Sequence, residues 1–239
     1  MPFVNLNPEI YFNGYYVQGW SKSAQFKLDN EPQDCTTLAD TTRIYKPGME
    51  NVEVSIEGYD DYAQTTGTDY RYNIIDGATV NNVIITMCPQ NDSAGKPSYT
   101  GTFNLADYNK THTVGEMVKF TINAKASGSI WFKGTVLEGD RSVSGAGNGT
   151  PIQLGAVSAT QGVYAALHVT LAGTNLVVKL QSDSASNFPS ATDVITFATT
   201  SAVGAELKSV AGANTDTYWR CSWTLAGGNS TFTVVVGIR

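Results

Sequence analysis

The sequence predicts an all-β fold of two antiparallel β-sandwich domains with only short helices. Charged residues make up 15% of the 239 residues, against roughly 25% in an average soluble protein, whereas Thr, Ser, Val, Gly and Tyr are plentiful, as is typical of strands joined by tight turns. Apolar and polar residues alternate with period 2 over many short segments. Clusters of Gly, Asn, Asp and Ser separate these segments, which favours antiparallel pairing over parallel βαβ units.

The segment VEVSIE is the clearest predicted strand. Because side chains of a strand point alternately to its two faces, Val52, Val54 and Ile56 are expected in a core, whereas Glu53 and Glu57 face water. We therefore expect this strand to have an acidic outer face.

Other segments alternate in the same way. Residues 118–125 and 219–225 are the clearest of them, and helices are expected only as one or two turns at 105–109 and 205–210. Further strands are expected at 83–87, 130–137, 163–171, 176–181, 194–198 and 231–238. The core residues that these patterns add are Phe120, Ile122, Trp219, Trp223 and Leu225.

A glycine-rich run at 144–150 is the predicted domain boundary. Its three alternating glycines are typical of a flexible linker, and no helix pattern or P-loop lysine follows to make it a phosphate-binding loop. Residues 1–143 carry 11 Lys and Arg against 17 Asp and Glu, whereas residues 144–239 carry four of each sign. The expected organisation is an acidic β-sandwich over 1–143 and a neutral one over 151–239.

The two predicted domains show a hint of internal duplication. Trp131 is followed by Leu at six residues and Gly at eight, and Trp219 is followed by the same two residues at the same spacings. A Val-Gly pair precedes each tryptophan, 17 residues before the first and 16 before the second. Two copies of one sandwich would explain the match.

The segment from Pro32 to Gly48 lacks a strand pattern. Its seventeen residues exceed the usual connection, and long ordered loops commonly bind something. Leu38, Ile44 and Tyr45 are apolar groups that a purely solvated loop would not need. We interpret the segment as an interaction loop.

Catalytic and metal-binding patterns are missing from the sequence. The two histidines, His112 and His168, form no metal-ligand spacing, and His168 is expected at a surface or an interface. The three cysteines are widely spaced, and no nucleophile elbow, kinase or Walker motif occurs. We expect no enzymatic activity, metal or cofactor. The acidic pair Asp60–Asp61 is explained by a solvated turn as well as by glycoside hydrolysis.

Charge and hydropathy limit the partners. The net charge of −6 disfavours binding to phosphate backbones, and no apolar stretch is long enough to span a membrane. The first ten residues lack the pattern of a signal peptide, so synthesis in the cytoplasm is expected.

Two stretches of the sequence have the order of motifs of a known family. The first runs from Lys27 to Asp61 and includes the segment RIYKPG at 43–48 before the strand VEVSIEGYDD. The second runs from YAALHV at 164–169 through VKLQSD and VITF to DTYWRCSWT at 216–224. Both stretches resemble the major tail tube proteins of long-tailed, siphovirus-type bacteriophages and prophages.

This resemblance implies a structural virion protein that forms rings stacked into a tail tube, through which DNA passes without specific binding. The expected partners are the tape measure, tail terminator and distal tail proteins, with assembly in the host cytoplasm. If the two sandwiches are duplicates, three two-domain chains form a ring with pseudo-sixfold symmetry, and this is our expectation. The alternative is a ring of six chains with the neutral domain on its outside, which the difference in charge between the two domains favours. An acidic lumen would not retain DNA, so the lumen candidates are Glu53, Glu57, Asp60 and Asp61. The candidates for contacts between subunits or rings are Leu38, Asp40, Arg43, Ile44, Tyr45, Pro47 and Gly48.

A binding module of another class is the alternative. The neutral second domain would suit a tail or capsid decoration or a receptor-binding protein that takes carbohydrate. The stacking platform would then come from Tyr15, Tyr16, Tyr59, Tyr62, Tyr70 and Tyr72. A tube protein would form rings or filaments at high concentration, whereas such a module would stay small.

Overall fold

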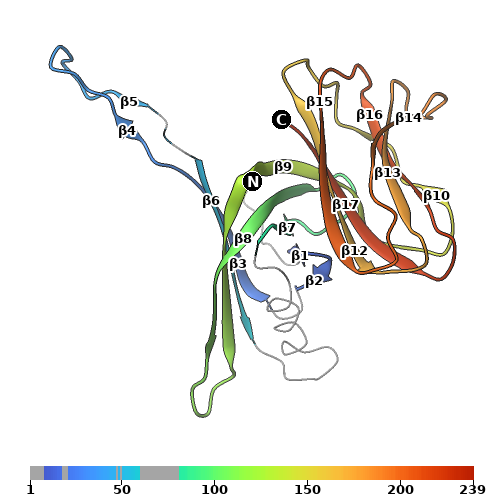
Figure 1. Cartoon of the computed structure of the whole chain (residues 1–239), viewed down its shortest axis with the longest axis horizontal. Coiled ribbons are helices and arrows are strands. Elements are labelled where there is room, and N and C mark those ends of the chain that lie inside the picture. Colours follow the sequence, from blue (N-terminus) through green and yellow to red (C-terminus); the bar gives the residue numbers. More distant parts are fainter. Residues whose placement is uncertain (1–7, 18–20, 47, 49, 60–80) are drawn as a thin grey trace. The chain divides into compact units, whose positions relative to one another are not determined.

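The computed structural model describes residues 8–17, 21–46, 48, 50–59 and 81–239. These residues form β-strands and no helix, so the all-β prediction is confirmed (Figure 1). The strands are β1 (Glu9–Phe12), β2 (Tyr15–Tyr16), β3 (Ser21–Asn30), β4 (Gln33–Asp34), β5 (Tyr45–Lys46), β6 (Glu50–Tyr59), β7 (Val83–Cys88), β8 (Pro97–Thr111), β9 (Lys119–Val143), β10 (Gly147–Asn148), β11 (Ile152–Gln153), β12 (Gly162–Leu171), β13 (Val177–Asp183), β14 (Thr192–Thr196), β15 (Gly204–Ala211), β16 (Tyr218–Thr224) and β17 (Ser230–Ile238).

The prediction of two short helices is wrong. Residues 105–109 belong to β8, and residues 205–210 belong to β15. β15 pairs with β12 in unbroken antiparallel register from Gly204 opposite Val169 to Ala211 opposite Gly162. Because a one- or two-turn helix is marginal by itself, a complete ladder with a neighbouring strand overrides the local preference.

The chain divides into two compact units that are interleaved along the sequence. Unit 1 contains residues 1–19, 84–102 and 130–239, and unit 2 contains residues 20–83 and 103–129. This division differs from the expected boundary at 144–150. That segment includes β10, which pairs with β16, and Gly149 donates its N–H to the Cys221 carbonyl at 2.8 Å. The glycine-rich run is therefore built into a sheet of unit 1.

Unit 1 contains a β-sandwich. One layer includes β15, β12, β17 and the second half of β9, and the other contains β10, β11, β16, β13 and β14. The core between them is filled by alternate residues of facing strands, such as Leu167 of β12, Leu180 of β13 and Trp219 of β16. Trp219 is fully buried, and its indole N–H donates to the Gly155 carbonyl at 3.0 Å. Trp223 is also buried, whereas Leu225 packs against this core only partly buried.

The strand β12 is buried on both faces. Its second face packs Ala166 into a smaller core with Phe132, Val136 and Val235. His168 lies on this same face and is fully buried. The expectation of a surface or interface histidine is therefore wrong, because this polar-looking face is covered by other strands of unit 1.

Unit 2 is organised around β6. This strand pairs with β3 on one side and with residues 119–125 of β9 on the other, both antiparallel. The side chains of Val52, Val54 and Ile56 are buried. Ile122 lies opposite Ile56 and Phe120 lies opposite Gly58, and both are buried too. The period-2 pattern of these strands thus corresponds to one buried and one polar face.

The residues matched in the duplication hypothesis have different surroundings. Trp131 is half-buried in β9, with the Arg239 guanidinium 5.0 Å from its ring, whereas Trp219 lies in the sandwich core. Gly139 packs so closely on the Asp92 backbone that a Cβ would lie 1.7 Å from its carbonyl oxygen, whereas Gly227 faces open space. The matched spacings therefore do not correspond to equivalent places in the fold.

Candidate assembly surface

The segment expected to be a long loop is a β-hairpin arm that extends β3 and β6. We define the arm as residues 31–46. Within it Gln33 pairs with Lys46 and Asp34 with Tyr45, and the Cys35 N–H donates to the Ile44 carbonyl at 2.8 Å. Figure 1 shows β4 and β5 projecting together beyond the end of β6. The arm is therefore an ordered projection rather than an irregular loop.

Short polar side chains shape the end of the arm. The Asp40 carboxylate accepts the backbone N–H of Thr37 at 2.7 Å and its hydroxyl at 2.8 Å. At the opposite side of the turn, the Asp34 carboxylate accepts the Thr36 hydroxyl and also the backbone N–H of Thr36, the latter at 2.9 Å. These hydrogen bonds lower the pKa of both carboxyl groups. Asx interactions of this kind fix a turn without any core beneath it.

Apolar side chains line the arm without a core to cover them. Leu38 at its end is fully exposed, and Ile44 and Tyr45 are 42% and 52% exposed. The Arg43 guanidinium donates to the Tyr45 hydroxyl at 3.2 Å. An ordered projection with exposed Leu, Ile and Tyr side chains is typical of a surface that contacts another protein.

A glycine closes the base of the arm. A Cβ at Gly48 would lie 2.0 Å from the Glu31 carbonyl oxygen, so only glycine permits the two sides of the hairpin to approach there. Pro47, the neighbouring candidate, lies outside the described residues.

The polar face of β6 carries both signs of charge. Glu53 lies in register between Lys27 of β3 and Lys125 of β9, with its carboxylate 3.3 Å from the Lys125 ammonium. Asn51 donates to the same carboxylate at 3.1 Å, and these two contacts lower the pKa of Glu53. Glu57 is exposed. The lumen candidates therefore have two lysines beside Glu53, a feature that the alternation pattern did not reveal.

The other two acidic lumen candidates, Asp60 and Asp61, lie outside the described residues. Three of the six tyrosines proposed for carbohydrate stacking, Tyr62, Tyr70 and Tyr72, also lie outside the described residues. Tyr16 is partly exposed, and its hydroxyl donates to the Glu9 carboxylate.

A second exposed apolar site lies at the β8–β9 turn, which we define as residues 112–118. Val114 is fully exposed and Met117 is 63% exposed. The turn closes with the Glu116 N–H donating to the Thr113 carbonyl at 3.1 Å, and Gly115 has a φ of +86°. Sequence reasoning missed this site, although the sequence TVGEM between two alternating segments was the available signal.

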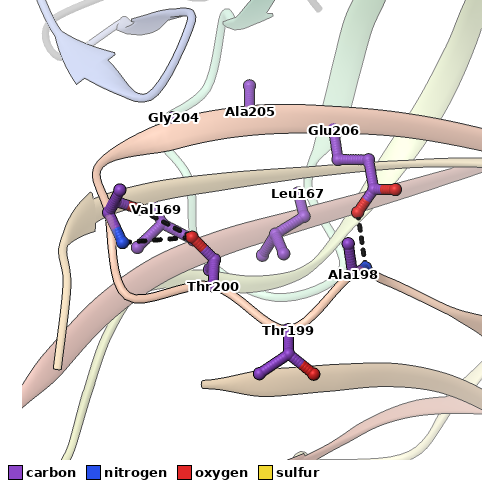
Figure 2. A pocket seen from close by; sticks show the side chains of 9 residues that line it. Leu167, Val169, Ala198, Thr199, Thr200, Gly204, Ala205 and Glu206 are labelled. Atoms are coloured by element: carbon purple, nitrogen blue, oxygen red, sulfur yellow. Dashed lines mark hydrogen bonds between the residues drawn. The ribbon is translucent and has the colours of Figure 1, made fainter. Parts of the chain in front are cut away.

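Figure 2 shows a pocket in unit 1 that is lined by Leu167 and Val169 of β12 and mainly by small side chains from residues 198–206. Its carboxylate, Glu206, accepts the Ala198 N–H at 2.7 Å and lies 2.9 Å from the Lys208 ammonium. The Thr200 hydroxyl donates to the Ala202 carbonyl at 3.0 Å. The polar groups of this pocket are thus used in holding its own wall, and none of these contacts forms a nucleophile–base pair.

Among the described residues, no group of three His, Cys, Asp or Glu side chains converges in the way metal ligands do. The same part of the chain includes no helix able to span a membrane.

Comparisons with known proteins gave structural similarities only. No protein-family model and no curated protein matches the chain. A chain of the virion of a native gene transfer agent particle is 12% identical, with a TM-score of 0.42 over 52% of this chain and 94% of that one. The SPP1 tail tube is 11% identical, with a TM-score of 0.44 over 55% and 78%. SPP1 Dit, a hub protein of the adsorption apparatus of phages that infect Gram-positive bacteria, is 11% identical, with a TM-score of 0.37 over 98% and 99%.

Proposed function

We propose that this chain is a non-enzymatic structural protein of a phage-type virion, which assembles with copies of itself into the rings of a tail tube. The observation that carries the proposal is the arm. It is ordered by its own hydrogen bonds, yet it exposes Leu38, Ile44 and Tyr45. A chain that keeps such a projection in solution requires a partner surface to cover it.

The arrangement of sheets supports self-association. β15 ends the main sheet of unit 1 and β3 pairs only with β6 within the described residues, so both present strand edges. Exposed edges are sites at which another chain can add a strand. A ring of identical chains would cover edges that an isolated chain leaves open.

The proposal that the tube conducts DNA depends on the charge of the surface that lines it. The face of β6 that carries Glu53 and Glu57 is the proposed lumen surface, and the lysines beside Glu53 make its local charge mixed rather than strongly acidic. A near-neutral or acidic wall lets a duplex pass, whereas a strongly basic wall would hold its phosphates. In this proposal the chain reaches the virion tail from the host cytoplasm, and tape measure, terminator and distal tail proteins meet the ends of the tube.

Negative-stain electron microscopy of the purified full chain at high concentration tests the proposal, with rings or stacked rings as the expected result. Deletion of residues 38–45 should abolish tubes and leave a folded monomer, because the deletion removes the apolar end of the arm but no buried residue. A point variant, Leu38→Glu, should act in the same direction.

Leu171→Glu is the matched control, because Leu171 is an exposed leucine at the end of β12, outside the arm. This variant should assemble as the wild type does. A wild-type chain that stays monomeric at high concentration and binds glycans would overturn the proposal in favour of a carbohydrate-binding module.

A further inference from the structure

The apolar sites of unit 2 lie at opposite ends of one sheet. β3 and β6 pair from Asn30 opposite Glu50 at the end that leads into the arm, whereas Tyr59 at the other end of β6 lies opposite Lys119, the first residue of β9. The β8–β9 turn follows directly from that second end (Figure 1). The ten residues of β6 separate the two ends by about 30 Å, at roughly 3.3 Å per residue.

Neither site is covered within its own unit. The arm extends away from β6 at one end and Leu38 is fully exposed, while the β8–β9 turn exposes Val114 and Met117 at the other. A single copy cannot bring these two sites together, because the sheet that carries both holds them apart.

From this placement we infer that the β8–β9 turn is the docking surface for the arm of a second copy of this chain. The inference rests on the proposed function and deepens it by naming the receiving surface. Since the donor and the receiver are different surfaces of one chain, the contact is heterologous and repeats from copy to copy, as a closed ring or as an open stack according to the rotation between copies. Because the two surfaces lie at opposite ends of β6, we assign the open arrangement, a stack along the direction of this strand.

Charge does not oppose this contact. The arm carries Glu31, Asp34 and Asp40 against Arg43 and Lys46, which gives a net charge of −1. The turn itself carries Glu116, and Lys110 and Lys119 flank it, so residues 110–119 have a net charge of +1 with His112 neutral. Both sites are therefore weakly charged, and the two flanking lysines suit the acidic residues of the arm, so apolar contacts between Leu38, Val114 and Met117 can dominate the interface.

Cysteine cross-linking between separate chains tests the contact directly. The background is Cys35→Ser, because Cys35 is exposed whereas Cys88 and Cys221 are buried. A Leu38→Cys chain mixed with a Met117→Cys chain should form a covalent heterodimer under mild oxidation. The control pair is Leu38→Cys with Leu171→Cys, since Leu171 is an exposed apolar residue of unit 1 on a strand that is not a sheet edge, and it should not cross-link.

Mixing variants with one damaged surface gives a second readout. Leu38→Glu lacks the arm surface, and the double variant Val114→Glu, Met117→Glu lacks the receiving surface. Each alone should remain unstacked, with an unchanged melting temperature because the replaced side chains are exposed. Mixed together, they retain one working contact and should form assemblies that stop at two layers in sedimentation and microscopy.

The outcomes separate the inference from the proposed function. If the wild type stacks and Leu38→Glu does not, but the Val114→Glu, Met117→Glu variant stacks normally and the Leu38–Met117 cross-link is absent, the receiving surface lies elsewhere and this inference is overturned. If the wild type itself forms no assembly, the proposed function fails. Cross-linking together with two-layer mixtures supports both.

Discussion

The backbone N–H of Gly14 donates a hydrogen bond of 3.2 Å to Nδ1 of His168, a residue 154 positions later in the chain. Because Nδ1 accepts, the ring proton of the neutral imidazole is on Nε2, which donates to the Thr86 hydroxyl at 2.8 Å. Thr86 in turn lies 3.0 Å from the Thr100 hydroxyl. This chain of hydrogen bonds satisfies a fully buried histidine and holds the β1–β2 turn against β12.

The stability of the chain should depend on pH through His168. Burial lowers the pKa of this imidazole from 6.5 to about 3. The unfolded state therefore binds more protons than the folded state between these values, so the contribution of His168 is complete above about pH 6.5 and is lost as the pH falls toward 3. The maximal slope is about 1.4 kcal/mol per pH unit.

Urea denaturation between pH 7.5 and 4 measures this slope. His168→Gln should reduce the stability at pH 7 and also flatten its dependence on pH, because the titrating group is gone while the carboxylates are unchanged. Equal slopes in the wild type and the variant would show that His168 does not contribute to acid sensitivity.

The position of the β1–β2 turn should be sensitive to a methyl group at Gly14. This residue has a φ of +87°, and a Cβ there would lie 2.4 Å from the Gly204 carbonyl oxygen. Gly95→Ala is the matched control, since Gly95 has a φ of +86° and no atom within 4 Å of the added Cβ. The control should lower the free energy of unfolding by about 1 kcal/mol, from backbone strain alone.

Gly14→Ala should lower the free energy of unfolding by at least about 2 kcal/mol more than this control does. The added Cβ would clash with the backbone of Gly204, so the turn must move away from β15. Differences in the free energy of unfolding measure both variants. Equal losses would mean that the contact between Gly14 and Gly204 contributes nothing.

Reversing the charge of the proposed lumen surface should retain DNA. Glu53→Lys would place a new lysine between Lys27 and Lys125, and Glu57→Lys would add a second one further along the same face. Rings should still form because both carboxylates are on the polar face of β6. DNA ejection from particles that carry this variant should be slowed at low salt and recover as salt is raised.

The control replaces the same two glutamates with glutamine, which removes charge without adding a positive one, and should slow ejection less. Ejection that is equally fast at low salt in the wild type and the lysine variant would place this face outside the lumen.

The number of chains in a ring follows from whether the chain repeats its fold. The expected pseudo-sixfold ring of three chains depends on Trp131 and Trp219 being equivalent positions of a duplicated sandwich. The two residues lie in different surroundings, so the duplication no longer supports that ring. We expect six chains. Native mass spectrometry of single rings should give six times the chain mass of 25.6 kDa. Three times this mass would restore the two-domain trimer.

The alternation of apolar and polar residues predicted the strands well where one face of the strand is exposed to solvent. It identified Val52, Val54 and Ile56 as buried residues because β6 has one polar face. It failed at His168, since β12 is covered on both faces and a polar residue can be satisfied there by Gly14 and Thr86. Alternation reports local geometry and cannot reveal which strand covers the second face.

The candidate site was only partly accessible to sequence reasoning. The apolar residues of the arm stood out, but its hairpin pairing depends on two-residue strands and on turns fixed by Asp34 and Asp40. The lysines around Glu53 come from strands far away in the sequence, and only the register of β3 and β9 brings them together. Val114 was missed because a single exposed residue in a turn has no periodic signal.

The length of β9 has a consequence for how the chain is made. Its last residue, Val143, pairs with Ser230 of β17, which is synthesised 87 residues later. At about 5–20 residues per second, the second half of β9 waits roughly 4–17 seconds on the ribosome before its partner exists. During that interval an apolar strand edge is open to other nascent chains. Folding yield should therefore depend on translation speed and on chaperones, and a fragment that ends near residue 143 should aggregate rather than fold.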